Sequence, residues 1–216
     1  MHKHLPLLSC PLLLAACGTS PAPVGLDYTL ARRLDGDRTG ACLAVAVIGE
    51  KTERAIHCAN SGAEGALDFG TAFEVGSISK AMTGILLADA ERRGELRLDA
   101  PLGDYLPADA HVPELDGVQI TLRDLATHTA GLPALPARLE SPDPADPYAT
   151  LSEAVLLASL DDMVLTAPPG EHWAYSNYGF MLLSKVLAQA TGRDVSTLLE
   201  ERLFRPLGMR AFVGPA

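Results

Sequence analysis

The spacing of apolar residues predicts a pair of strands near the start of the chain. Residues 26–34 have helical spacing, and a glycine follows shortly after them as a helix stop. Residues 41–49 and 53–61 then read as two strands around a turn, because the first of them is rich in valine and isoleucine. The chain is therefore expected to open with a helix and a β-hairpin.

Helical patterns dominate the rest of the chain. An apolar helix is expected to begin at Ser77 and to end at Gly94. Further helices are predicted at 98–107 with Asp99 as the N-cap, at 121–131 with a capping box of Thr121 and Asp124 and a stop at Gly131, and at 152–160, 176–192 and 194–204. Between them, residues 133–150 hold too many prolines for a helix or a central strand.

The predicted strands form a sheet that is too small to cover the apolar surfaces of the predicted helices. Two strands alone form a marginal sheet, and three or more are usually needed for independent stability. The helix that begins at Ser77 is apolar around much of its circumference, as is typical of a helix buried against a sheet. We therefore expect either that residues outside this chain complete the sheet or that the fold leaves a large apolar surface open.

The N-terminal residues predict an exported lipoprotein. Residues 1–16 combine a short basic segment with an apolar run that is too short to span a bilayer, and the run ends in small residues before Cys17. This arrangement resembles a bacterial lipobox, in which Cys17 would take the lipid and residues 17–25 would form a short tether to a domain at 26–216. The alternative is an ordinary secretory signal that happens to contain a cysteine.

The charge and the cysteine content of the chain limit the kinds of partner and cross-link that are expected. The formal net charge is −10, which disfavours nucleic acid, since phosphate binding requires clustered lysine and arginine. After export, Cys42 and Cys58 would remain, on either side of the predicted turn and in a compartment that permits disulfides. A cross-strand disulfide and a pair of buried thiols are both compatible with this spacing. Metal binding is not expected, because the sequence has neither a CxxC nor an HExxH motif.

Ser77 and Lys80 form the only Ser-x-x-Lys of the chain, at the start of the apolar helix. Positions three apart share a helix face, so the lysine amine can reach the serine hydroxyl. A helix N-terminus also favours negative charge that develops beside it. Alternatively, Ser77 is an ordinary helix cap followed by an ordinary lysine.

Tyr175, Ser176 and Asn177 form the only Tyr-x-Asn, in a predicted loop directly before a helix. A tyrosine and an amide presented from there could face Ser77 across a cleft. Tyr175 would share the proton with Lys80, and Asn177 would orient Lys80 and bind the substrate amide. The alternative is a turn with a helix cap and a packed aromatic side chain.

With these motifs, the chain from about residue 26 to 214 resembles the serine β-lactamase-related hydrolases, which include class C β-lactamases, D-alanyl-D-alanine peptidases and esterases. The blocks that carry the resemblance occur in the family order, at residues 73–88, 96–107, 120–133, 170–192 and 204–209. The resemblance implies an α/β (α+β) fold in which an antiparallel sheet carries a helical subdomain.

The resemblance also implies roles for individual residues. Ser77 matches the acylated nucleophile, Lys80 its partner base, Tyr175 the second general acid/base and Asn177 the substrate-binding amide. His128 lies in a family block, where we expect it to hold structure and not to perform chemistry. The implied reaction is acyl transfer on amide, lactam or ester bonds of cell-wall peptides or β-lactam-like compounds, with no metal or organic cofactor.

One family motif is absent from the chain. The sequence contains no Lys-Thr-Gly or His-x-Gly third motif, so we expect that the C-terminal strands of the sheet are missing and that these residues alone fold poorly or are inactive. A second hypothesis is a non-catalytic lipoprotein that binds cell-wall peptide or a protein partner. In either case the predicted location is the bacterial cell envelope, lipid-anchored at the periplasmic face of the outer membrane. The sequence does not indicate an oligomeric state.

Overall fold

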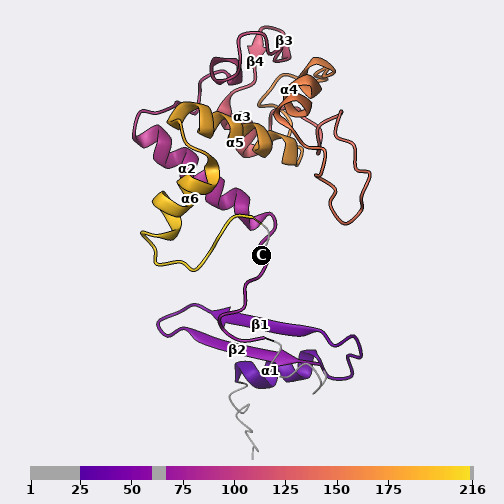
Figure 1. The fold of residues 1–216 in the computed structure, drawn as a ribbon, viewed down its shortest axis with the longest axis vertical. Helices are drawn as coiled ribbons and strands as arrows, with labels where there is room; N and C mark the ends of the chain where they lie inside the picture. The colour runs from indigo at the N-terminus through magenta and orange to yellow at the C-terminus, as the bar shows by residue number, and fades with distance from the viewer. Residues whose placement is uncertain (1–24, 60–66, 215–216) are drawn as a thin grey trace, which may run out of the picture. The chain divides into compact units, whose positions relative to one another are not determined.

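The computed structural model describes residues 25–59 and 67–214, which form two compact units divided between Thr71 and Ala72 (Figure 1). The predicted signal peptide and Cys17 lie outside the described residues, as does the predicted tether except Gly25. No helix among the described residues is long and apolar enough to cross a membrane. Each unit is described by itself.

The first unit contains the predicted helix and hairpin. Helix α1 (Leu26–Arg33) lies against strand β2 (Glu53–Cys58), which pairs antiparallel with β1 (Cys42–Val47). In this register Cys42 stands opposite Cys58, and a disulfide joins them. Of the two states that the sequence left open for these cysteines, the structure therefore contains the oxidised one.

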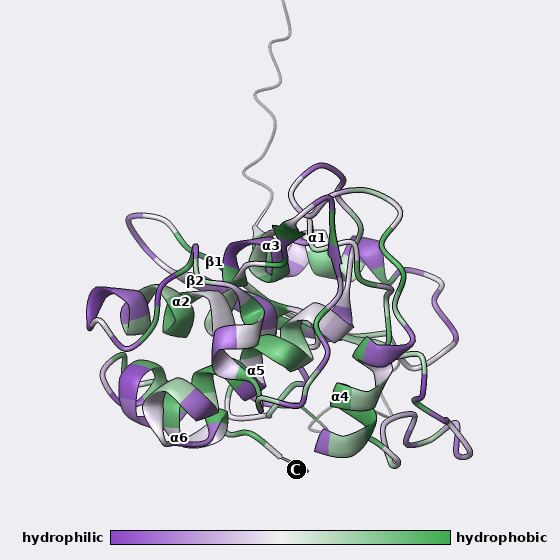
Figure 2. Ribbon diagram, turned by 90° about the horizontal axis from the view of Figure 1, so that it is seen from above, coloured by the Kyte–Doolittle hydropathy of each residue, from purple (hydrophilic) through white to green (hydrophobic). Residues whose placement is uncertain are grey.

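The second unit is built around one central helix, α5 (Asn177–Thr191). It packs against α2 (Ile78–Arg92), α3 (Leu122–Thr127), α4 (Glu153–Asp161), α6 (Val195–Leu199) and the 3-10 helix η2 (Leu102–Tyr105). A π-helical turn, η3 (Glu200–Phe204), continues α6 and contacts α2. Figure 2 shows the hydrophobic positions of α5 in green. The helical subdomain implied by the resemblance is thus a bundle around α5.

Local signals explain where α5 begins and ends. The Ser176 hydroxyl accepts the backbone N–H of Gly179, as an N-cap should, and Gly192 ends the helix in the left-handed region at φ 68°. The fully buried Tyr178 donates its hydroxyl to the Leu156 carbonyl of α4, so its polar atom is satisfied inside the core. These bounds match the predicted helix.

Two predicted helix ends are wrong. Asp99 does not cap the helix at 98–107. A 3-10 turn begins there after Pro101 instead, and Asp99 forms an ion pair with Arg123 at 2.7 Å. Helix α3 has the predicted capping box, but it ends before Gly131, because His128 takes the left-handed conformation at φ 61°. A histidine in that conformation is uncommon and gives no strong stop signal in a sequence.

A small hairpin was not predicted. Strands β3 (Glu114–Leu115) and β4 (Val118–Gln119) pair around Asp116 and Gly117, which have φ values of 54° and 76°. Asp-Gly is a strong signal for such a turn, but each strand has only two residues and shows no alternation that a pattern could detect. The described residues therefore contain two separate two-stranded sheets.

Helix α2 keeps part of its apolar circumference uncovered within the second unit. Ile78 and Ile85 are 63% and 53% exposed, whereas Leu86 and Leu87 on the other side are buried. This matches the expectation that the helix is apolar on more sides than its own unit covers.

Candidate active site

Ser77 lies at the N-cap position of α2, yet its side chain forms no capping hydrogen bond. The first turn is closed by the backbone: Ile78, Ser79 and Lys80 donate N–H groups to carbonyls three residues earlier, each at 3.1 Å. Gly76 permits this tight turn, at φ 50°. The Ser77 hydroxyl is thereby left for other partners.

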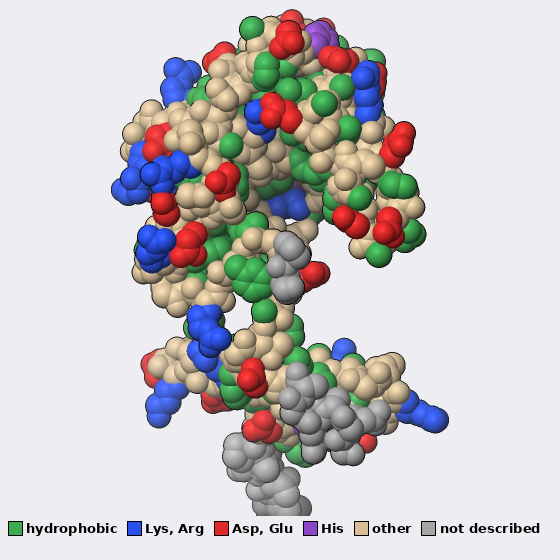
Figure 3. Space-filling view, in the orientation of Figure 1, with side chains coloured by type: hydrophobic (Ala, Val, Ile, Leu, Met, Phe, Trp, Pro, Cys, Tyr) green, Lys and Arg blue, Asp and Glu red, His purple; other side chains and the backbone are tan. Residues whose placement is uncertain are grey.

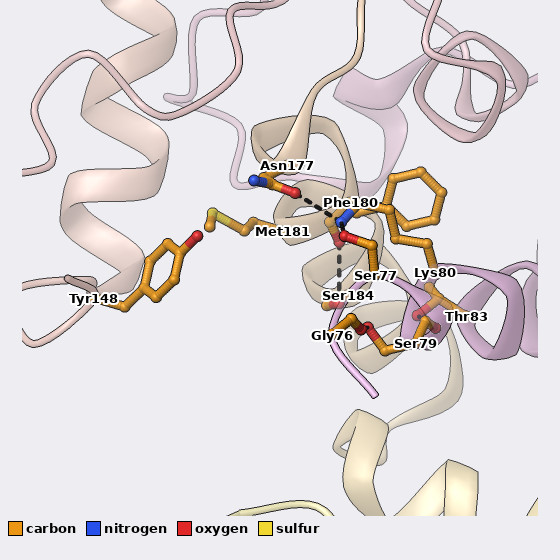
Figure 4. Close-up of a pocket in the computed structure, with 10 residues that line it drawn as sticks. All are labelled: Gly76, Ser77, Ser79, Lys80, Thr83, Tyr148, Asn177, Phe180, Met181 and Ser184. Carbon is orange, nitrogen blue, oxygen red and sulfur yellow. Dashed lines mark hydrogen bonds between the residues drawn. The ribbon is translucent and has the colours of Figure 1, made fainter. Parts of the chain in front are cut away.

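Those partners are the other predicted site residues. Ser77 Oγ and the Tyr175 hydroxyl share a hydrogen bond of 2.6 Å, and Lys80 Nζ donates to Ser77 Oγ at 3.3 Å. Lys80 Nζ also donates to Asn177 Oδ1 at 2.6 Å, and Figure 4 shows this amide pointing at the amine. All four predicted residues lie in the second unit, and the fold brings them together across α2 and the start of α5.

The segment before α5 is held by backbone carbonyls of the loop that follows α3. Ser176 Oγ donates to the Pro133 carbonyl at 2.7 Å, and Asn177 N–H donates to the Ala134 carbonyl at 2.9 Å. Because Ser176 is also the cap of α5, one buried hydroxyl joins the loop, the segment and the helix. The backbone that carries Tyr175 and Asn177 is therefore held in place by these hydrogen bonds.

The charge on Lys80 acts on the neighbouring phenol. Hydrogen bonding to Lys80, and then to Ser77, holds the pKa of Tyr175 below its usual 10. Lys80 Nζ also lies 5.0 Å from the centre of the Tyr175 ring and 5.5 Å from that of Phe180. A phenol with a lowered pKa beside a serine hydroxyl can exchange a proton with it more readily.

An open pocket of about 390 Å³ adjoins Ser77. Three of the predicted residues line it, Ser77, Lys80 and Asn177. It is also lined by Tyr148 from the proline-rich loop and by Phe180, Met181 and Ser184 of α5. In Figure 4 the Tyr148 hydroxyl points toward Met181, and Figure 3 shows a hollow in this face of the unit. The three residues of α5 follow Asn177 at helical spacing, a signal that the sequence analysis did not use.

His128 lies behind the Tyr175 ring. Its Nδ1 accepts the Ser176 backbone N–H at 3.1 Å, and its ring centre lies 4.7 Å from that of Tyr175 and 5.1 Å from that of Phe180. Burial, and then the charge of Lys80, lower the pKa of His128 below its usual 6.5. These contacts fit the structural role that we expected for this residue.

A comparison with known families places the chain. The model of the beta-lactamase family matches residues 26–213. The chain belongs to the beta-lactamase family. The resemblance drawn from the sequence is thereby confirmed.

Two curated relatives illustrate this. The D-alanyl-D-alanine-carboxypeptidase/endopeptidase AmpH of Escherichia coli is 38% identical over 136 residues, which are 63% of this chain and 35% of AmpH. Penicillin-binding protein 4 of Amycolatopsis lactamdurans is 32% identical over 186 residues, 82% of this chain and 46% of that protein. The chain thus spans less than half the length of these beta-lactamase family relatives.

Solved structures show the same fold. A beta-lactamase/D-alanine carboxypeptidase from Yersinia pestis superposes with a TM-score of 0.70 at 25% identity, over 81% of this chain and 50% of that one. A D-stereospecific amidohydrolase from Streptomyces sp. superposes with a TM-score of 0.66 at 28% identity, over 86% and 54% of the two chains. The predicted mixed α/β fold of the beta-lactamase and peptidase type is therefore confirmed.

Proposed function

We propose that this chain carries the acylation machinery of a serine hydrolase that acts on amide, lactam or ester bonds. The observation that carries the proposal is the position of Ser77 Oγ, within hydrogen-bond reach of both Lys80 and Tyr175. A nucleophilic serine needs an adjacent group to take its proton, and here two such groups converge on one oxygen. Asn177 holds Lys80 toward that oxygen.

The chemistry proceeds in two steps. Ser77 Oγ bonds to the carbonyl carbon of the substrate while the Lys80–Tyr175 pair takes the hydroxyl proton, and the carbonyl π electrons move to the oxygen. The N-terminus of α2 favours that negative charge. When the carbonyl re-forms, the bond to the leaving nitrogen or oxygen breaks, and the pair returns the proton to it. Water then releases the acyl group from Ser77 by the same route.

Cell-wall peptides and β-lactam-like compounds are the proposed substrates. The relatives bear the names of carboxypeptidases, a penicillin-binding protein and beta-lactamases, and one structural neighbour is a D-stereospecific amidohydrolase. Such substrates support a location in the bacterial cell envelope. Lipidation of Cys17 after cleavage of residues 1–16 would hold it at the membrane there, with residues 17–25 as the tether.

A covalent probe with two matched variants tests the proposed function. The protein, Ser77→Ala and Ser79→Ala are each incubated with a fluorescent penicillin and with a fluorophosphonate, and their intact masses are measured. Ser79 is the right control because it is a second hydroxyl at the start of α2 whose proton is donated to the Gly76 carbonyl at 2.7 Å.

The expected result is an adduct on the unchanged protein and on Ser79→Ala, and none on Ser77→Ala. Failure of both probes to react with the unchanged protein would contradict the proposal. It would favour the alternatives, which are an inactive chain that lacks the third motif and a lipoprotein that only binds cell-wall peptide or a protein partner. An adduct that persists in Ser77→Ala would show that another residue is the nucleophile.

A further inference from the structure

The contacts around His128 concern the residues on which the proposed acylation depends. We propose that His128, as a neutral imidazole, positions Tyr175 and Asn177 against Ser77, and that its protonation releases them and slows acylation in acid. This inference rests on the proposed function, and it assigns His128 as a positioning residue of the site. Its imidazole touches the Tyr175 ring and the Ser176 amide and needs no contact with the substrate.

The hydrogen bond between His128 and Ser176 requires a neutral imidazole. A backbone N–H can only donate, so His128 Nδ1, 3.1 Å away, must present a lone pair, and the ring proton must sit on Nε2. An imidazolium carries protons on both nitrogens and cannot accept this bond. Ser176 is almost fully buried, so its N–H cannot form a hydrogen bond with bulk water when the histidine acceptor is lost.

His128 contacts residues 174–176 at more than one point. Its carbonyl accepts the Ala174 N–H at 2.8 Å, and its ring packs on Tyr175 at an angle of 38°. The left-handed backbone of His128 directs the chain so that main chain and side chain face the same segment. Residues 174–176 are therefore tied to one residue on both sides of the tyrosine.

Several titratable or charged groups lie on the elements around the imidazole of His128. Lys80 of α2 is the cation whose field reaches it, and Tyr175 is the phenol beside it. On α3, Asp124 is engaged by Thr121 and Thr129. From α5 the neighbouring ring is Phe180, which does not titrate.

The direction of the pH effect follows from these charges. Burial and Lys80 disfavour the imidazolium, so the folded state keeps the neutral form at neutral pH. Because the pKa of His128 is lowered in the folded protein, the imidazole stays mostly neutral at pH 6.5 and holds the segment there, and it becomes protonated only as the pH falls through that lowered value.

The test is the pH profile of Ser77 acylation by a fluorescent penicillin, for the protein, His128→Asn and His128→Leu. Asparagine tolerates the left-handed backbone and offers an oxygen that accepts the Ser176 N–H, but it does not titrate. Leucine offers neither a ring nitrogen nor an oxygen. The acylation rate constant of the protein should fall in acid, at a pH below the ordinary histidine value of about 6.5, and it should lose this fall in His128→Asn. In His128→Leu it should be roughly tenfold lower than in the protein at neutral pH and should not fall further in acid, so the two rates approach each other there.

Two kinetic results would overturn the proposal. If His128→Asn shows the same acid fall as the unchanged protein, the titrating group is not His128. If His128→Leu folds and is acylated as fast as the unchanged protein, the histidine positions nothing.

A second measurement does not depend on acylation. In ¹⁵N NMR spectra of the Ser77→Ala protein, the His128 ring nitrogens should show the Nε2–H form at neutral pH. The Ser176 amide signal should shift together with imidazole protonation. An imidazole that titrates without moving that amide would overturn the positioning role, even in a protein that no probe acylates. Loss of acylation with this coupling intact would instead count against the proposed function alone.

Discussion

At the scale of single residues, the site depends on a serine that occupies a capping position without capping. Ser77 is the residue type that helix N-termini prefer, and sequence reasoning alone favours a cap over a nucleophile. The structure closes the first turn of α2 with backbone bonds and turns the hydroxyl toward Lys80 and Tyr175. A side chain that could stabilise its own helix is thus available for chemistry.

Asn177 is the residue whose loss should be most informative about Lys80. Removing the amide in Asn177→Ala deletes a 2.6 Å hydrogen bond from the Lys80 amine. A hydrogen bond to a charged group contributes about 1.5–3 kcal/mol, so the acylation rate constant should fall roughly 10- to 100-fold. The measurement is the rate of labelling by a fluorescent penicillin.

The matched control for Asn177 is Gln189→Ala, an exposed amide on the same helix. It should label at the rate of the unchanged protein. If Asn177→Ala labelled equally fast, the amide would not hold the amine in place, and the proposed role of Asn177 would be wrong.

At the scale of elements, the proline-rich loop contributes a wall of the pocket. The prolines of residues 133–150 exclude a helix or a central strand, and a role of this loop in shaping the pocket was a hypothesis that named no residue of it. In the structure this loop places Tyr148 opposite Met181 of α5, at the pocket beside Ser77. No local pattern predicts this contact, because it depends on how the loop returns across the helix.

Tyr148 should therefore influence which acyl groups the pocket accepts. In Tyr148→Ala, the second-order labelling rate of a penicillin with a large aromatic side chain should fall roughly fivefold, about 1 kcal/mol of lost apolar contact. A penicillin with a small side chain should be affected less. Tyr148→Phe, which keeps the ring, should retain the preference. An equal fall for both penicillins would show that the loop does not select the side chain.

A second contact between elements stabilises the bundle. Arg202 of the π-helical turn donates to both carboxylate oxygens of Glu95, at 2.7 and 2.9 Å, and approaches Asp89 of α2 at 3.4 Å. Hydrogen bonding from Arg202 holds the pKa of Glu95 below its ordinary value of 4.5. This partly buried pair joins the π-helical turn to the C-terminal end of α2 and the residues that follow it.

Arg202→Ala should lower the free energy of unfolding by about 1–3 kcal/mol at neutral pH. Because the pKa of Glu95 is lowered, the difference should be complete above pH 4.5 and shrink as the pH falls below it. Denaturant titrations followed by the fluorescence of the single tryptophan, Trp173, measure it in this unit. Arg205→Ala is the control, because its pair with Glu200 is exposed and 3.6 Å long. Equal stability of all three proteins would contradict the account.

At the scale of the whole molecule, the sequence predicts which helices and strands form better than it predicts which segments pack against one another. Helix α5, the β1–β2 hairpin and the capping box of α3 follow from local signals and appear as expected. The early end of α3 was not expected, because it depends on His128 adopting a left-handed backbone that few histidines take.

The candidate site shows the same division. Two short motifs and a family resemblance were enough to select Ser77, Lys80, Tyr175 and Asn177, but not the tyrosine and methionine that face each other across the pocket. Those depend on tertiary packing between segments far apart in the chain. The excess of apolar surface on α2 was predictable, since a helix apolar on most sides needs more cover than this unit supplies.

The central claim is that Ser77 is the residue that becomes acylated, and peptide mapping tests it most directly. The protein is incubated with a penicillin, digested, and analysed by tandem mass spectrometry to locate the added mass. The account predicts one acyl group per chain, on Ser77. A modification on any other residue, or none at all, would contradict it.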